Sequence, residues 1–285
     1  MNDSLSLLIV HAHPDDECLT TGGTLARYVA EGCQVALVIA TGGEEGEIVV
    51  PELDTPKNKA RLRAMRDEEL ACSCRQLGVT QLERLGYRDS GMVGTEANDN
   101  PACFHQADPD EALGRLVALV RRHRPQVLVS YDERGGYGHP DHVACHKATV
   151  AAFTAAGDPT RFPEAGPAWR PLKLYYSALP RRSLLQAWEY MRAQGMPSPL
   201  DNPEFDITNF TVDDNQITAS LSIQPYMEQK RRAVECHVTQ IRRDSPFLTM
   251  PEELMRDIWG YEHFTLVEAR VPTEPREDDL FAGLR

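Results

Sequence analysis

The chain has 285 residues, of which 41% are hydrophobic and 26% are charged, a balance typical of a globular protein and too apolar for a disordered one. Its 43 acidic residues outnumber the 30 Lys and Arg residues, and the formal net charge of −13 argues against a nucleic-acid partner. No apolar run approaches the ~18 residues of a membrane span, and the start lacks the basic residues of a signal peptide, so we expect a cytoplasmic protein with no membrane partner.

Strands and helices alternate along the first 155 residues. Residues 5–10 and 35–40 are nearly continuous apolar runs, which are typical of strands covered on both faces. A weak strand pattern covers residues 82–87, and a strand bounded by Pro125 covers residues 126–130. Helical patterns cover residues 21–31, 57–77, 110–123 and 140–155. This order predicts an α/β fold, a Rossmann-like and mostly parallel sheet with helices on both faces.

The composition changes in the Pro- and Gly-rich segment 157–171, which is followed by a strand at 172–177 and mixed helix and strand patterns. We therefore expect residues 1–160 to form the Rossmann-like core with the metal site. Residues 161–285 are expected to be a C-terminal α+β elaboration of the same domain that shapes the substrate pocket. The seven scattered cysteines include no C-x-x-C pair and are expected to be reduced. The oligomeric state is left open, and a homo-oligomer is compatible with the sequence.

Two tetrapeptides of nearly the same form carry the chemistry, His-Pro-Asp-Asp at 13–16 and His-Pro-Asp-His at 139–142. Each follows a predicted strand and places proline where a helix begins, a position that suits proline because no intrahelical partner for its N–H is needed there. Both turns should therefore lie at the carboxyl ends of parallel strands, the edge where open α/β sheets bind ligands. They can form one site if their two strands are close in the sheet, which we infer.

Together the two turns offer the ligands of a catalytic metal. His13, Asp16 and His142 supply two nitrogens and one carboxylate, which leaves one position of a zinc ion open for water. Asp15, His139 and Asp141 then remain for acid–base chemistry. Two histidines and a carboxylate also form the facial triad of non-haem Fe(II) oxygenases, and a sugar-binding protein without turnover is a third interpretation. An acid and a base beside the metal favour hydrolysis over both.

The two motifs resemble those of a known family. HAHPDDE at residues 11–17 and GGYGHPDH at 135–142 are similar to the PIG-L/LmbE-like zinc de-N-acetylases. The resemblance extends over nearly the whole chain and is greatest to the mycothiol branch, which contains mycothiol S-conjugate amidases and N-acetylglucosaminyl-inositol deacetylases. It implies a zinc-dependent amidohydrolase that removes the N-acyl group from such a glucosaminide. The alternative is a deacetylase of another N-acetylglucosaminide, of the bacillithiol type or from a natural-product pathway.

The resemblance also implies roles for single residues. The ligands of zinc, for which Fe²⁺ is an alternative, would be His13, Asp16 and His142. Asp15 would be the general base, His139 the general acid or electrostatic stabiliser, and Asp141 the residue that orients His139.

Further roles concern the substrate. Tyr137 would be a mobile donor to the oxyanion, and Arg66 and Asp89 would hold the glucosamine-inositol part. Thr20 stands where the amidases tend to carry lysine, whereas much of the C-terminal half resembles the amidases, so the resemblance leaves deacetylase and amidase open.

Overall fold

Strand β1 (Ser6–His11) lies at the centre of a seven-stranded sheet in the computed structural model, which describes residues 4–285. The strand order is β3-β2-β1-β4-β5-β7-β6. The other strands are β2 (Gln34–Thr41), β3 (Gln81–Tyr87), β4 (Val127–Ser130), β5 (Lys173–Ala178), β6 (Ala219–Ser222) and β7 (Tyr261–Ala269). Strands β1 to β5 pair in parallel, and β7 and β6 extend the sheet in the antiparallel sense. The mostly parallel sheet is thereby confirmed.

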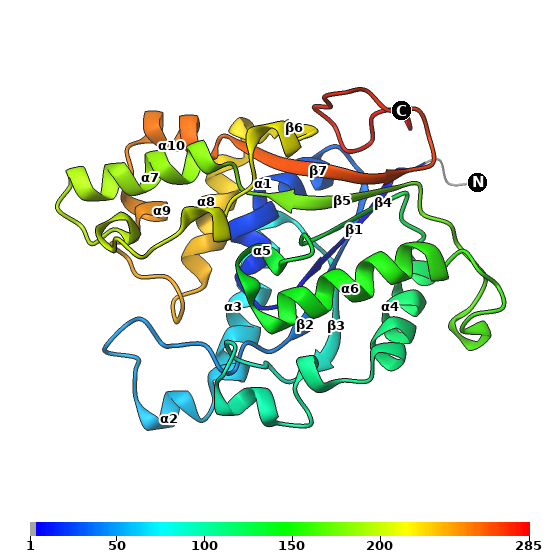
Figure 1. Cartoon of the computed structure of the whole chain (residues 1–285), viewed down its shortest axis with the longest axis horizontal. Helices are drawn as coiled ribbons and strands as arrows, with labels where there is room; N and C mark the ends of the chain where they lie inside the picture. The colour runs from blue at the N-terminus through cyan, green and yellow to red at the C-terminus, as the bar shows by residue number, and fades with distance from the viewer. Residues whose placement is uncertain (1–3) are drawn as a thin grey trace.

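Helices cover both faces of the sheet, as the sequence predicts (Figure 1). The longer ones are α1 (Asp16–Ala30), α3 (Leu62–Leu77), α4 (Pro109–His123), α6 (Pro140–Ala155), α7 (Arg181–Ala193) and α8 (Met227–Cys236). The shorter ones are α2 (Pro56–Lys59), α5 (Gly135–Gly138), α9 (Pro246–Thr249) and α10 (Glu252–Trp259). Leu8 of β1 packs in the core cluster with α4 and α6, whereas Leu7 packs with α1, α3 and α8. Burial on both faces explains the continuous apolar run.

The two His-Pro-Asp turns of the sequence meet because β1 and β4 are neighbours. Leu7 pairs with Val127 and Ile9 with Val129, so the chain leaves both strands at the same edge of the sheet. Strands β2 and β3 lie on one side of this pair and β5 on the other. The crevice between β1 and β4 is therefore the switch point at which open α/β sheets place their ligands.

Two helix boundaries differ from the prediction. Helix α1 begins at Asp16 rather than at residue 21, because Asp16 and Glu17 form an acidic first turn without apolar periodicity. The helix is interrupted at Thr21 (φ −131°), the residue at which the predicted helix begins. The predicted helix 57–77 is two helices, α2 and α3, because Arg61 lies at φ −121° and interrupts the helical backbone.

The expectation of reduced cysteines is wrong for two of the seven. A disulfide joins Cys72 of α3 to Cys236 at the end of α8, and their Cα atoms are 5.7 Å apart. The two residues are 164 positions apart in the sequence, so no local spacing indicates the pair. Within the described residues, no helix combines the length and the apolar character that crossing a membrane needs.

Candidate metal centre and active-site cleft

Three side chains from the two turns form a triangle of ligand atoms. The Nδ1 atom of His13 lies 3.2 Å from Nε2 of His142 and 3.4 Å from Oδ2 of Asp16, and the last two atoms are also 3.4 Å apart. A tetrahedral ion with bonds of ~2.0–2.1 Å separates its ligand atoms by about 3.3 Å. The residues present therefore fit a divalent metal with three protein ligands and one open position.

The tautomers of both histidines suit this triangle. His13 directs Nε2 to the Asp141 carboxylate at 3.2 Å, and His142 directs Nδ1 to the carbonyl oxygen of Gly135 at 3.1 Å. With a metal bound, a proton on each of these outer nitrogens would leave the other nitrogen unprotonated and directed into the triangle. Such outer partners fix the orientation of metal-binding histidines.

Asp16 is held by groups outside the triangle. Its Oδ2 accepts hydrogen bonds from the His13 N–H and from the Tyr131 hydroxyl, each at 2.8 Å. Burial alone would raise the pKa of Asp16, but the neighbouring His142 and His13 rings hold it well below its usual range. The carboxylate is therefore ionised, as a metal ligand must be.

Tyr131 is a site residue that the sequence reasoning missed. Its ring stacks on the His142 ring with centroids 4.1 Å apart, and its hydroxyl also accepts the Ala12 N–H and contacts Nδ1 of His11. The available signal was its position directly after β4, at the ligand-binding edge of the sheet. Tyr131 thus links the two turns through Asp16 and His142.

Asp15 lies beside the triangle on the cleft floor, with its side chain 18% exposed. Burial raises the pKa of this carboxyl to about 6, although the Arg66 guanidinium opposes the shift. Nη2 of Arg66 is 3.0 Å from Asp15 Oδ2 and also donates to the Pro14 carbonyl, while Nη1 donates to the Gly43 carbonyl. A carboxylate with a pKa near 6 is ionised at neutral pH and basic enough to take a proton from water.

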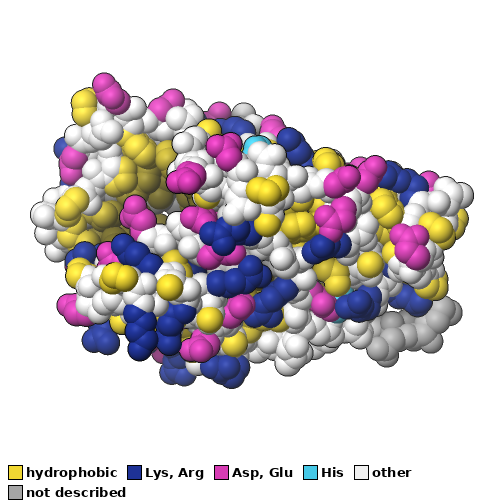
Figure 2. Space-filling view, turned by 90° about the horizontal axis from the view of Figure 1, so that it is seen from below, with side chains coloured by type: hydrophobic (Ala, Val, Ile, Leu, Met, Phe, Trp, Pro, Cys, Tyr) yellow, Lys and Arg dark blue, Asp and Glu magenta, His cyan; other side chains and the backbone are white. Residues whose placement is uncertain are grey.

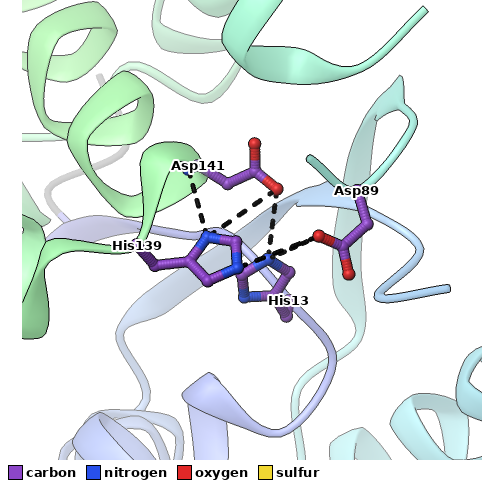
Figure 3. Close-up of side chains that lie close together, drawn as sticks. All are labelled: His13, Asp89, His139 and Asp141. Carbon is purple, nitrogen blue, oxygen red and sulfur yellow. Dashed lines mark hydrogen bonds and ion pairs between the residues drawn. The ribbon is translucent and has the colours of Figure 1, made fainter. Parts of the chain in front are cut away.

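His139 and Asp89 complete a second cluster around His13 (Figure 3). The rings of His13 and His139 are edge to face with centroids 4.4 Å apart, and Asp89 Oδ1 lies 3.5 Å from His13 Nε2 and 3.9 Å from His139 Nε2. Burial, followed by the charges of His13 and His142, lowers the pKa of His139 to about 4. The imidazole is therefore neutral at pH 7 in the metal-free protein.

The Asp141 carboxylate is directed at a different histidine from the one expected. It accepts hydrogen bonds from His13 and from the N–H and hydroxyl of Ser90, whereas its nearest oxygen is 4.0 Å from His139 Nδ1 (Figure 3). The His139 ring instead accepts the Asp141 backbone N–H at 3.2 Å, as the cap of α6. Asp141 thus orients His13, and Ser90 is the residue that holds it.

Arg66 and Asp89, both expected to hold the glucosamine-inositol part, bond to different parts of the protein. Arg66 is 3% exposed and bonds to the Asp15 turn, whereas Asp89 accepts the N–H groups of Glu45 and Gly91. Burial would raise the pKa of Asp89, but hydrogen bonding and charge from His13 keep it below its usual range. In the described part of the chain no hydrogen bond joins the two side chains.

A cleft of about 430 Å³ opens above Asp15, Asp16 and His142. Tyr137, 42% exposed, stands at its wall with its ring centroid 4.9 Å from that of His142. Although the residue as a whole is partly exposed, desolvation of its hydroxyl in the cleft raises the pKa of Tyr137 above its ordinary value, so the hydroxyl remains a donor. Aromatic side chains form much of the remaining wall, namely Trp188, Phe210, Phe247 and Trp259. Thr20 also lines the cleft.

The surface around this end of the molecule is partly apolar. Figure 2 shows a hollow with hydrophobic side chains at the end where Figure 1 places α7 and α10. On the same face Lys and Arg side chains are interspersed with Asp and Glu, so neither sign of charge forms a continuous surface (Figure 2).

Comparisons with known proteins agree with the two motifs. A family model described as PIG-L, GlcNAc-PI de-N-acetylase, matches residues 8–153. The chain is 44% identical over 292 residues to a 1D-myo-inositol 2-acetamido-2-deoxy-alpha-D-glucopyranoside deacetylase of Geodermatophilus obscurus, with 100% of this chain and 99% of the relative covered. A 1D-myo-inositol 2-acetamido-2-deoxy-alpha-D-glucopyranoside deacetylase 2 of Frankia casuarinae is 45% identical over 300 residues, with 97% of this chain and 93% of the relative covered. The fold is shared by N,N'-diacetylchitobiose deacetylase from Pyrococcus horikoshii, with a TM-score of 0.63 at 20% identity and coverage of 93% and 84%.

Proposed function

Because this chain belongs to the PIG-L family of de-N-acetylases, we propose that it hydrolyses the N-acetyl amide of a glucosaminyl-inositol, releasing acetate and the free amine. The triangle of His13, Asp16 and His142 beside the raised-pKa carboxyl of Asp15 is the observation that supports this most. The deacetylase names of the full-length relatives support the substrate class.

The ion proposed for the triangle is Zn²⁺, with Fe²⁺ as the alternative. Two imidazole nitrogens and one carboxylate are ligands that both ions accept. When bound, the ion would supply the acidity that makes water a nucleophile at neutral pH and would polarise the amide carbonyl.

The protein groups around the triangle supply the proton transfers. We assign Asp15 as the base that takes a proton from the attacking water and returns it to the nitrogen that leaves as an amine. The Tyr137 hydroxyl is assigned as a donor to the oxyanion that develops on the carbonyl oxygen. The His139 ring accepts the Asp141 N–H at Nδ1, so its Nε2–H is available as a second donor to this oxyanion.

The sugar is expected to lie in the cleft above Asp15, between the metal turns and the C-terminal elaboration. Residues 161–285 contribute Trp188, Phe210 and Trp259 to the wall, which supports their proposed part in shaping the pocket. Arg66 and Asp89 remain candidates for holding the glucosamine-inositol part, although their observed bonds are to protein groups.

A second candidate is the S-conjugate amidase reaction, which cleaves the amide at the same glucosamine nitrogen. The aromatic wall of the cleft favours it, because a substrate with an apolar substituent could bury that group there. Amine release measured side by side on N-acetylglucosaminyl-inositol and on a mycothiol S-conjugate decides between them. Absence of amine from both substrates in metal-loaded protein would reject the proposed function.

We also propose a cytoplasmic location, in keeping with a small-molecule substrate. The Cys72–Cys236 disulfide is the feature that disagrees with a reducing compartment. Thiol labelling in freshly lysed cells, before any exposure to oxidant, measures how much of the pair is closed where the protein resides.

A further inference from the structure

We propose that Glu17, His237 and Ser73 form a buried positioning cluster that holds Asp15 in its working conformation. The inference rests on the proposed function, because it concerns the base of that reaction. None of the three side chains touches the metal triangle, and all three are fully buried.

The backbone of Asp15 needs such support. Asp15 has φ 113°, a region that residues with a side chain rarely adopt, and it is the residue that precedes α1. Backbone conformations of this kind persist only where the surrounding structure fixes them, and they concentrate at functional sites. The Asp15 N–H donates to Oε2 of Glu17 at 2.8 Å.

The other oxygen of Glu17 is held from two directions. The Ser73 hydroxyl of α3 donates to Oε1 at 2.5 Å, and Nε2 of His237 lies 2.8 Å from the same atom. One carboxylate oxygen therefore binds the Asp15 turn while the other is fixed by two separate elements. Glu17 can rotate away from Asp15 only by breaking both of these contacts.

The segments that carry Ser73 and His237 are themselves joined. Cys72 and Cys236 immediately precede these residues and form the disulfide. Glu69, one turn before Ser73 on α3, accepts both the N–H and the hydroxyl of Thr239, each at 2.8 Å, and Thr239 lies two residues after His237. The two partners of Glu17 thus lie on two segments that are joined by the disulfide and by the hydrogen bonds between Glu69 and Thr239.

The metal ligand next in the chain has independent support. Asp16 is held by the His13 N–H and the Tyr131 hydroxyl, neither of which contacts Glu17. Loss of the cluster should therefore displace Asp15 and leave the metal in place. This separation distinguishes a positioning role from general support of the metal turns.

The test compares Glu17→Ala, Glu17→Gln, His237→Ala and His237→Gln in the metal-loaded chain of 285 residues. Glu17→Ala and His237→Ala should lower kcat by about 10- to 100-fold, the scale of a misplaced catalytic group, with KM within about twofold and metal content at the wild-type level. Glu17→Gln keeps an acceptor for the Asp15 N–H, and His237→Gln keeps a donor for Glu17, so each should recover most of the loss.

Glu277→Gln is the matched control, since this carboxylate is also buried but pairs with Lys173, at the opposite end of β5 from Ser177 and Ala178, which line the cleft. It should lower the melting temperature without changing kcat. If the alanine variants keep wild-type kcat, or if they lose metal in proportion to activity, the inference is overturned. Two metal ions per wild-type chain would also overturn it, because Glu17, Cys18 and His237 lie close enough to ligate a second ion. An inactive wild-type protein would instead reject the proposed function.

Discussion

Replacement of Arg66 by methionine should move the acid limb of the pH profile to higher pH. The substitution removes a guanidinium whose Nη2 lies 3.0 Å from Asp15 Oδ2 and retains most of the aliphatic volume. The positive charge of Arg66 lowers the pKa of Asp15, against the burial that raises it to about 6. Without that charge the pKa rises further, so at a given acidic pH a smaller fraction of Asp15 is ionised and able to act as a base.

The size of the shift follows from the contact. A hydrogen bond between charged groups contributes ~1.5–3 kcal/mol, and one pKa unit corresponds to ~1.4 kcal/mol, so the limb should move by about one to two pH units. Solvent screening reduces this little, because the Arg66 and Asp15 side chains are only 4% and 18% exposed. Below the shifted limb kcat/KM should fall roughly 10- to 100-fold relative to wild type, and above it most of the loss should disappear.

The assay is amine release at a series of pH values with two substrates, N-acetylglucosaminyl-inositol and N-acetylglucosamine. If Arg66 acts on Asp15, both substrates should show the same shift. Arg63→Met is the matched control, because Arg63 lies on the same helix, is 45% exposed and pairs with Glu44 instead. An unmoved limb together with a loss confined to the inositol substrate would refute this reasoning and assign Arg66 to the recognition of the cyclitol.

Three further predictions test the site and the fold. His13→Ala and His142→Ala should each abolish stoichiometric metal, measured by elemental analysis, while the circular dichroism spectrum stays native; full occupancy in both would reject the ligand assignment. With metal content unchanged, Asp15→Ala and His139→Ala should each lower kcat by roughly 10²-fold or more, and wild-type turnover would reject both catalytic assignments. Cys72→Ser should lower the free energy of unfolding by ~2–4 kcal/mol. In the wild-type chain, alkylation after unfolding without a reductant should label the five free cysteines, and labelling of all seven would disprove the disulfide.

The fold was predictable wherever burial on both faces leaves a continuous apolar run. Leu7, Leu8 and Ile9 are fully buried from opposite sides, and their run indicates a central parallel strand without further information. The start of α1 could not be found in this way. Its first turn is formed by Asp16 and Glu17, whose side chains point to the metal triangle and to the positioning cluster rather than to an apolar core.

The candidate ligands were predictable because each turn carries its own donors within four residues. The partners of those donors were not, since they depend on which groups from distant segments approach each ring. Asp141 turns to His13 rather than to His139 because Ser90, from the loop after β3, fixes its carboxylate. No spacing in the sequence records that approach, which arises only when β3 and β4 take their places on either side of β1 and β2.

The same argument applies to the base. Asp15 belongs to a four-residue motif, but its conformation depends on Glu17, which in turn depends on residues from α3 and from the end of α8. Helix α8 lies in the part of the chain that follows the family match at 8–153, so that match contains the ligands and the base but only part of the structure that holds the base. We therefore expect activity to depend on the segment that follows residue 153, because His237 in that segment holds the Glu17 carboxylate.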